Sequence, residues 1–212
     1  MSSDLLDQLG AARLVPVVVL DDAGDAASLA QALVAGGLPV AEVTFRTEAA
    51  LAAIEAIAER GDVLVGAGTV LTPEQVDAAV DAGAQYIVSP GFHAPVVERA
   101  QARGVLPLPG AVTATEIQAA LGAGLTTVKY FPAETSGGAK AIKALSAPFT
   151  DVRFVPTGGI GPTNLAEYLA LPSVHAVGGS WMVPRDKVAA GAFDEITSLT
   201  AQAVELAANP PA

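Results

Sequence analysis

The sequence contains no cysteine, which excludes a disulfide framework and thiolate chemistry. It also lacks any apolar run that approaches the roughly 20 residues of a membrane-spanning helix, so we expect no membrane insertion. The N-terminal segment MSSDLLDQLG has no basic stretch followed by a hydrophobic one, which argues against a secretory signal. Together these absences predict a cytoplasmic protein.

Basic residues are scarce, because 11 lysines and arginines stand against 22 aspartates and glutamates, for a net charge of −11. Such a chain repels nucleic acid, and no Lys/Arg cluster offers a local exception, so we expect no nucleic-acid partner. The only histidines, His93 and His175, form neither an HxH nor an HExxH spacing. With no carboxylate cluster beside them, the sequence predicts no structural or catalytic metal.

The sequence does contain a regular series of short apolar blocks, each typical of a buried parallel strand and too short for a helix. Helical stretches separate these blocks, with start signals such as the capping box from Thr113 to Glu116 and with glycines at their ends. The eight blocks are LVPVVVL (14–20), AEVTF (41–45), VLVGAGT (63–69), YIVSPG (86–91), LPLPGA (106–111), TTVKYFPA (126–133), RFVPTGG (153–159) and AVGGSW (176–181).

Eight alternations of strand and helix predict parallel strands joined by crossover helices. A doubly wound open sheet would carry its glycine-rich phosphate loop after the first strand. Here Asp21 and Asp22 follow that strand, and glycines crowd the ends of the last two strands instead. We therefore predict an α/β fold of the (β/α)8 or TIM-barrel type, eight parallel strands with an outer ring of helices, formed by residues 1–212 as one domain.

Lys129 lies inside the sixth strand block, whereas the other three lysines fall in helical or loop segments. A lysine in a strand either points outward between helices or inward as a desolvated amine. An inward, desolvated amine takes the neutral and nucleophilic form more readily, which favours catalysis. Phe131 has the same strand parity as Lys129 and would supply an apolar wall beside it.

Glu42, Thr44 and Arg46 alternate along the second strand and its end, so all three are expected on one face. Polar side chains on one face are costly unless that face lines a polar cavity. An internal Glu-Arg ion pair that orients a loop is the simpler interpretation. Beside Lys129, however, Glu42 could transfer protons and Arg46 could hold a carboxylate.

Small and polar residues also mark the carboxyl ends of other strands, where the active site of a barrel lies. Thr69 ends the third strand block with a hydroxyl group. Gly158-Gly159 ends the seventh block and Gly178-Gly179-Ser180 ends the eighth. Each glycine pair alone is ordinary turn chemistry, but two pairs at consecutive strand ends favour phosphate binding.

The sequence resembles the family of 2-dehydro-3-deoxy-phosphogluconate (KDPG) aldolases, including their 4-hydroxy-2-oxoglutarate (KHG) aldolase activity. The resemblance covers nearly the whole chain and follows the family's order. The motifs that carry it are EVTFRT (42–47), GAGTVL (66–71), VSPG (88–91), KYFPAE (129–134), PTGGI (156–160) and GGSW (178–181).

The resemblance implies a homotrimeric class I aldolase without metal or other cofactor, acting on a phosphorylated keto acid. Lys129 resembles the family's Schiff-base lysine and Glu42 its proton-transfer carboxylate. The remaining residues resemble the family's binding groups: Arg46 and Thr69 for the pyruvyl carboxylate, Pro90 and Phe131 for the apolar wall, and Gly158, Gly159, Gly179 and Ser180 for the phosphate. Phe45 stands where the family often has leucine, and Phe92-His93 vary at the pocket rim.

Several alternatives remain open at this point. The galactonate series could replace the gluconate series, since the sequence does not fix the stereochemistry at C4. A deoxyribose-phosphate-type aldolase would not need Arg46, because its substrate has no carboxylate. An isomerase or synthase would use Lys129 as an acid, and a non-catalytic barrel would only bind a phosphometabolite or serve as an assembly subunit.

Overall fold

A computed structural model describes residues 2–209 of the chain, with side chains from residue 4 onward, so residues 1 and 210–212 of the predicted domain lie outside it. Each predicted block overlaps one strand, and only β2 begins before its block, at Val40. The strands are β1 (Leu14–Val18), β2 (Val40–Thr44), β3 (Leu64–Gly68), β4 (Tyr86–Ser89), β5 (Leu106–Pro109), β6 (Thr127–Tyr130), β7 (Arg153–Pro156) and β8 (Val177–Gly179). Every strand ends before its block does, so the last residues of each block belong to the following loop.

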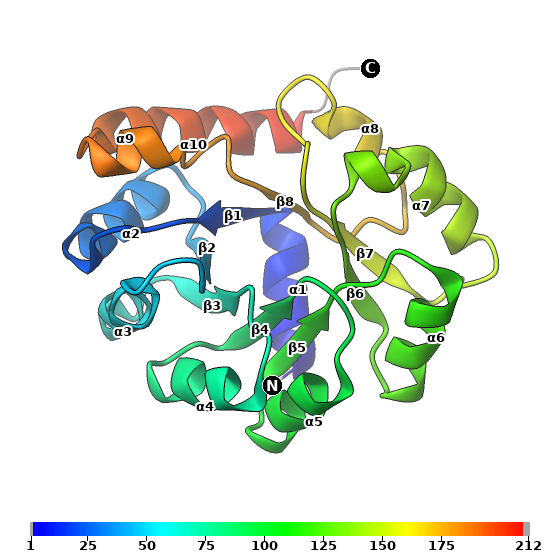
Figure 1. The fold of residues 1–212 in the computed structure, drawn as a ribbon. Helices are drawn as coiled ribbons and strands as arrows, with labels where there is room; N and C mark the ends of the chain where they lie inside the picture. The colour runs from blue at the N-terminus through cyan, green and yellow to red at the C-terminus, as the bar shows by residue number, and fades with distance from the viewer. Residues whose placement is uncertain (1, 210–212) are drawn as a thin grey trace.

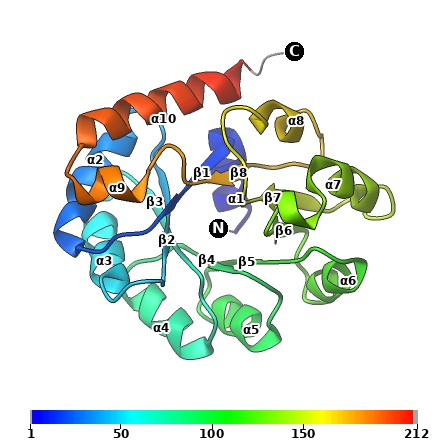
Figure 2. The same cartoon turned by 45° about the horizontal axis from the view of Figure 1, so that its top comes forward.

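Helices alternate with these strands and surround them (Figures 1 and 2). The α-helices are α1 (Ser2–Ala12), α2 (Ala26–Ala35), α3 (Ala50–Arg60), α4 (Pro73–Asp81), α5 (Ala94–Ala102), α6 (Ala114–Gly122), α7 (Gly138–Ser146), α8 (Leu165–Leu169), α9 (Arg185–Ala189) and α10 (Phe193–Ala208). Two 3-10 helices are also present, η1 (Ala23–Asp25) and η2 (Glu134–Ser136).

All strand pairs are parallel. Six strands are hydrogen-bonded in the order β5-β4-β3-β2-β1-β8, and β6 pairs with β7. Single bridges join Gly110 to Lys129, between the ends of β5 and β6, and Thr157 to Gly178, between β7 and β8. The predicted α/β class is thus confirmed, with parallel strands at the centre and helices around them.

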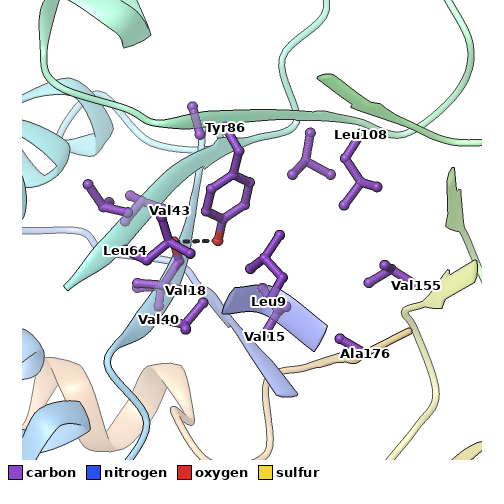
Figure 3. Packing of buried hydrophobic residues seen from close by; sticks show 14 of the residues in the cluster. Leu9, Val15, Val18, Val40, Val43, Leu64, Tyr86, Leu108, Val155 and Ala176 are labelled. Atoms are coloured by element: carbon purple, nitrogen blue, oxygen red, sulfur yellow. Dashed lines mark hydrogen bonds between the residues drawn. The ribbon is translucent and has the colours of Figure 1, made fainter. Parts of the chain in front are cut away.

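Helix α1 departs from the predicted outer ring, because it lies among the other elements rather than outside them (Figure 2). Its Leu9 is 1% exposed and belongs to the buried hydrophobic cluster that also includes Val15 and Val155 (Figure 3). Burying one leucine completely contributes about 1.5–3 kcal/mol, enough to hold a short helix in place. A nitrogen of His175 also contacts the carbonyl oxygen of Leu6 at 2.7 Å, so this histidine has a structural partner.

The side chain of Tyr86, from β4, projects into the interior between the strands and reaches β2 (Figure 3). It is fully buried, and its hydroxyl group donates a hydrogen bond to the carbonyl oxygen of Ala41 in β2 at 2.7 Å. Gly66 of β3 lies between them, and a Cβ atom there would come within 2.4 Å of the Tyr86 ring. A glycine is therefore required for β2, β3 and β4 to pack around this tyrosine.

The local signals read from the sequence are present in the structure. The capping box from Thr113 to Glu116 forms both of its hydrogen bonds. The helix-ending glycines adopt the positive φ that only glycine tolerates well. These five residues are Gly37, Gly61, Gly83, Gly104 and Gly124. Among residues 2–209, no helix is both long and apolar enough to cross a membrane.

Candidate active site

Lys129 points inward from β6, so the outward alternative is wrong. Its side chain is 7% exposed, and Nζ donates a hydrogen bond to Oε1 of Glu42 at 2.9 Å. The Glu42 side chain, from β2, is 3% exposed. Within residues 4–209 this is the only ion pair that Glu42 forms, so the simpler interpretation of a Glu42–Arg46 pair is also wrong.

Burying two opposite charges costs several kcal/mol per ion before their attraction is counted, so such a pair is a poor way to stabilise a fold. The pair instead places an amine and a carboxylate in proton-transfer distance inside a water-poor interior. A lysine and a carboxylate in direct contact form the arrangement of a nucleophile and its base. The geometry can therefore support covalent chemistry at Nζ of Lys129.

Gly68 at the end of β3 makes room for the Glu42 carboxylate. Gly68 pairs in register with Thr44, two residues after Glu42 on β2. A Cβ atom on Gly68 would lie 2.4 Å from Oε1 of Glu42, closer than real contacts allow. The small residue thus lets Glu42 reach Lys129. Thr44 itself does not point at a ligand, because its hydroxyl group donates to the carbonyl oxygen of Val18 at 2.9 Å.

Phe131 borders the amine, as its strand parity predicted. Nζ of Lys129 lies 5.3 Å from the centre of the Phe131 ring, within the range of a cation–π contact. Phe131 also lines a cavity that contains Arg46 and Ser180. One aromatic ring therefore borders both the buried amine and the cavity.

A cavity of about 390 Å³ lies at the carboxyl ends of β1, β6, β7 and β8. It brings together predicted site residues from distant parts of the chain. These are Arg46, Phe131, Gly158, Gly159, Gly179 and Ser180. Its volume falls within the range of small-molecule sites. The cavity also includes side chains that the sequence interpretation missed, among them Val17, Thr157, Ile160 and Arg185.

The glycines of the cavity leave backbone groups open to a ligand. Gly158 and Gly159 have φ values of 102° and 78°, and within residues 2–209 their N–H groups donate to no protein acceptor. Their carbonyl groups are occupied, since Gly158 accepts from the Glu134 amide and Gly159 from the Asn164 side chain. Free N–H groups in a tight turn suit an anion.

Four predicted residues lie outside the cavity lining: the buried pair Lys129 and Glu42, and also Thr69 and Pro90. Thr69 directly follows β3 and is half-buried, with a positive φ of 60°. A β-branched residue in this region is strained, and such strain clusters at functional sites. Pro90 follows β4, and its carbonyl group would lie 2.0 Å from a Cβ atom on Gly110. The roles predicted for Thr69 and Pro90 stay predictions.

The histidines do not contribute to this site. His93 is the exposed N-cap residue of α5, and His175 contacts α1. No group of three or more His, Cys, Asp or Glu side chains that could hold a metal ion occurs among residues 2–209. The chemistry of the described site therefore centres on an amine, a carboxylate, a guanidinium and backbone amides.

A family model described as KDPG and KHG aldolase matches residues 5–199, which is most of the chain. This chain belongs to that family. The KDPG aldolase of Treponema pallidum is 51% identical to it over 203 residues, which cover 95% of this chain and 97% of the relative. The resemblance read from the motifs is therefore confirmed.

Solved structures of family members match the whole architecture. A KDPG aldolase from Legionella pneumophila, with pyruvate captured as a covalent carbinolamine intermediate, superposes with a TM-score of 0.90 at 40% identity and covers 93% of this chain and 97% of its own. That of Zymomonas mobilis with 3-phosphoglycerate superposes with a TM-score of 0.89 at 44% identity and covers 96% of each chain. One of these relatives thus holds a pyruvyl group covalently, and the other was solved with a phosphorylated molecule.

Thr157 and Arg185 are the polar cavity residues that sequence reasoning missed. Thr157 directly follows β7 and is only 6% exposed, and its place in the PTGGI motif of the family was a usable signal. Arg185 begins α9 and binds Asp21, 164 positions earlier in the chain, through two hydrogen bonds of 2.8 and 2.5 Å. Nothing in the local sequence around Asp21 or around Arg185 signals that these two residues pair.

Proposed function

We propose that this chain is a class I aldolase that cleaves 2-dehydro-3-deoxy-6-phosphogluconate to pyruvate and D-glyceraldehyde 3-phosphate, and that it also accepts 4-hydroxy-2-oxoglutarate. The observation that carries the proposal is the buried contact of 2.9 Å between Nζ of Lys129 and Oε1 of Glu42. This contact pairs the nucleophile Lys129 with the base Glu42. The neighbouring cavity contains the guanidinium group of Arg46. Family membership gives the reaction class.

The reaction begins when Glu42 takes a proton from Lys129, and the free amine attacks the C2 carbonyl carbon of the substrate. The resulting carbinolamine loses its oxygen as water, with Glu42 moving the protons, and becomes a protonated imine. This imine is the electron sink for the next step. The covalent carbinolamine of pyruvate in the Legionella enzyme supports the same sequence of intermediates here.

Glu42 then removes the proton of the C4 hydroxyl group, through one water molecule. The electrons of the C3–C4 bond move into the imine, so an aldehyde leaves and an enamine remains on Lys129. Protonation at C3 and hydrolysis by water release pyruvate and the free lysine. General base catalysis of this kind contributes roughly 10² to 10⁴ in rate, which is the share we assign to Glu42.

The substrate carboxylate is placed by Arg46, whose planar guanidinium group matches a carboxylate with two hydrogen bonds. Thr69 adds a hydroxyl group at this end, and Pro90 and Phe131 form the apolar wall of the pyruvyl pocket. Fixing the carboxylate brings the C2 carbonyl group to the amine, which lowers the entropic part of the barrier. The Arg46 side chain lines the same cavity as Phe131, in support of this assignment.

The phosphate end is formed by backbone amides of Gly158, Gly159 and Gly179 and by the hydroxyl group of Ser180. The open N–H groups of the first two glycines support this assignment. Gly179 has no space for a side chain, because a Cβ atom there would lie 1.7 Å from the Trp181 ring. The 3-phosphoglycerate of the Zymomonas structure is a three-carbon phosphate of similar size to the aldehyde product.

The architecture that holds this site is one domain spanning 1–212, with all eight strands closed into a (β/α)8 barrel. The bridges between Gly110 and Lys129 and between Thr157 and Gly178 support closure, because they join the six-stranded sheet to the β6-β7 pair at both edges. We further propose a homotrimer. Membership of the family supports this assembly, since the family resemblance implies a trimer.

The test is a substrate panel with pyruvate release as the readout. Wild-type protein is expected to cleave the gluconate-series substrate faster than its galactonate epimer, and Lys129→Ala is expected to cleave neither. Faster cleavage of the galactonate epimer would reassign the substrate within the family. Unchanged activity in Arg46→Ala would favour a deoxyribose-phosphate-type reaction, and turnover of none of these compounds would overturn the proposal.

A further inference from the structure

Two cationic side chains line the cavity, and only one of them has a role so far. Arg46 serves the carboxylate end, whereas Arg185 lines the same cavity from the first residue of α9. Ser180, at the proposed phosphate end, precedes Arg185 by only five positions and lines the cavity with it. The substrate proposed above carries a negative group at each end, so a second cation has an evident ligand.

Asp21, which follows β1, holds the Arg185 side chain in one orientation. Nε and Nη2 of the guanidinium group donate to the two carboxylate oxygens at 2.8 and 2.5 Å. Within residues 4–209, Nη1 donates to no acceptor. The hydrogen bond from Arg185 lowers the pKa of the Asp21 carboxyl group, and Asp21 in turn raises the pKa of the guanidinium group.

Stability does not explain this pair. The side chains of Arg185 and Asp21 are 62% and 47% exposed, and exposed ion pairs contribute little to folding. The same bidentate geometry occurs between Arg60 and Asp62, at the end of α3, where neither residue lines the cavity. The two pairs differ in location, because Arg185 lines the cavity that also contains Arg46 and Ser180.

Because the net charge is −11, binding of an anion in the cavity depends on local cations such as Arg185. A phosphate dianion approaching this protein meets an unfavourable long-range field, so a donor at short range must compensate. An oriented guanidinium group loses little side-chain entropy on binding, because Asp21 already fixes it. Charge-assisted hydrogen bonds from arginine to phosphate are among the stronger polar contacts in proteins.

We infer that Arg185 is a specificity residue that recognises the terminal phosphate of the substrate, with Asp21 as its positioning residue. This inference rests on the proposed aldolase function. Nη1 of Arg185 donates to a phosphate oxygen, while the amides of Gly158 and Gly159 and the hydroxyl group of Ser180 bind the others. Arg185 thereby makes the enzyme prefer phosphorylated over unphosphorylated keto acids, without taking part in bond cleavage.

The experiment compares Arg185→Gln with Arg60→Gln, which removes the same charge from the matched surface pair. The readout is the ratio of kcat/KM for the phosphorylated gluconate substrate to kcat/KM for 4-hydroxy-2-oxoglutarate. Arg185→Gln is expected to lower this ratio about tenfold, the effect of losing one charge-assisted hydrogen bond. Arg60→Gln is expected to keep it within about twofold of wild type, since that exposed pair is remote from the ligand.

A titration with inorganic phosphate tests the same contact without turnover. Binding followed by calorimetry is expected to weaken about tenfold in Arg185→Gln and to stay unchanged in Arg60→Gln. Equal losses in both variants, or equal losses on both substrates, would overturn the role of Arg185. If wild-type protein cleaves neither substrate, the aldolase proposal fails, whereas the phosphate titration still decides whether Arg185 binds this anion.

Discussion

Glu42 and Lys129 lie 87 positions apart in the chain and touch at 2.9 Å, each almost completely buried. They come from β2 and β6, which are not hydrogen-bonded to each other. The contact therefore crosses the interior between the strands. Because both charges are almost completely buried and neither has another ionic partner among residues 4–209, changing one residue leaves the other in a costly state. Several predictions about activity and stability depend on this contact.

Glu42→Gln separates imine formation from the later proton transfers. The amide keeps the shape of the side chain but cannot accept a proton, so turnover should fall by about 10² to 10⁴. Pyruvate should still form a trappable imine, because Lys129 is retained. Steady-state kinetics on the gluconate substrate and mass spectrometry after reduction measure the two effects. Wild-type turnover in this variant would remove Glu42 from the mechanism.

Gly68→Ala tests whether the space beside Glu42 is needed. The added Cβ atom would meet Oε1 of Glu42 at 2.4 Å, so the carboxylate has to move away from Lys129. We expect turnover to fall at least tenfold and the free energy of unfolding to fall by about 1–3 kcal/mol, a typical cost of overpacking. Enzyme kinetics and urea unfolding measure these quantities.

The matched control is Gly122→Ala at the end of α6. A Cβ atom there meets nothing within 4 Å, and Gly122 is exposed. This change should leave turnover intact and stabilise the protein by about 0.5–1 kcal/mol, because alanine restricts the unfolded chain more than glycine does. Normal turnover in Gly68→Ala as well would show that the close fit around Glu42 is dispensable.

Thr69→Gly should raise the free energy of unfolding and weaken the binding of the keto acid. Thr69 has φ of 60°, where a β-branched residue costs about 1–2 kcal/mol relative to glycine. The variant should therefore unfold at higher urea concentration, with a gain of about 1 kcal/mol, while the Km for the keto acid rises because a hydroxyl group is lost. A destabilised variant with an unchanged Km would contradict both the strain and the binding role of Thr69.

Tyr86→Phe should lower the free energy of unfolding at neutral pH, because it removes a buried hydrogen bond to the Ala41 carbonyl group. The expected loss is about 1–2 kcal/mol. Burial, and secondly the charge of Glu42, raise the pKa of Tyr86 well above its ordinary value. Unfolding lets this phenol ionise near its usual pKa of roughly 10, so the wild type should lose stability as the pH rises above that value.

The pH dependence distinguishes this effect from simple loss of packing. Tyr86→Phe has one fewer group with a raised pKa, so its stability should fall less steeply than that of wild type above about pH 10. Burial also raises the pKa values of Tyr130 and Tyr168, so some slope should remain. Urea unfolding at pH 7 and at pH 10.5 measures both values, and parallel profiles would contradict the assignment to Tyr86.

Local features of the fold were readable from the sequence because their causes are local. The positive φ of Gly61 and Gly83 ends a helix within its own last turn, and the Thr113 cap acts over three residues. The strand blocks were likewise readable from continuous apolar runs. The inner position of α1 was not predicted, because it depends on Leu9 packing against strands that meet it only in the folded chain.

The candidate site was partly readable for the same reason. A lysine in the middle of an apolar strand and glycine pairs at strand ends stand out in one dimension. The partner of Glu42 could not be read from the sequence, because Arg46 is only four positions away whereas the actual partner, Lys129, is 87 positions away. Arg185 carries no local signal at all, since its pairing with Asp21 and its place in the cavity arise only from the tertiary structure.

The most direct test of the account is the intact mass of the protein after incubation with pyruvate and borohydride. Reduction converts any imine into a stable secondary amine on the lysine. We expect one pyruvate-derived adduct on the wild-type chain and none on Lys129→Ala. An adduct of equal yield on the variant, or no adduct on folded wild-type protein, would contradict the central claim that Lys129 is the nucleophile.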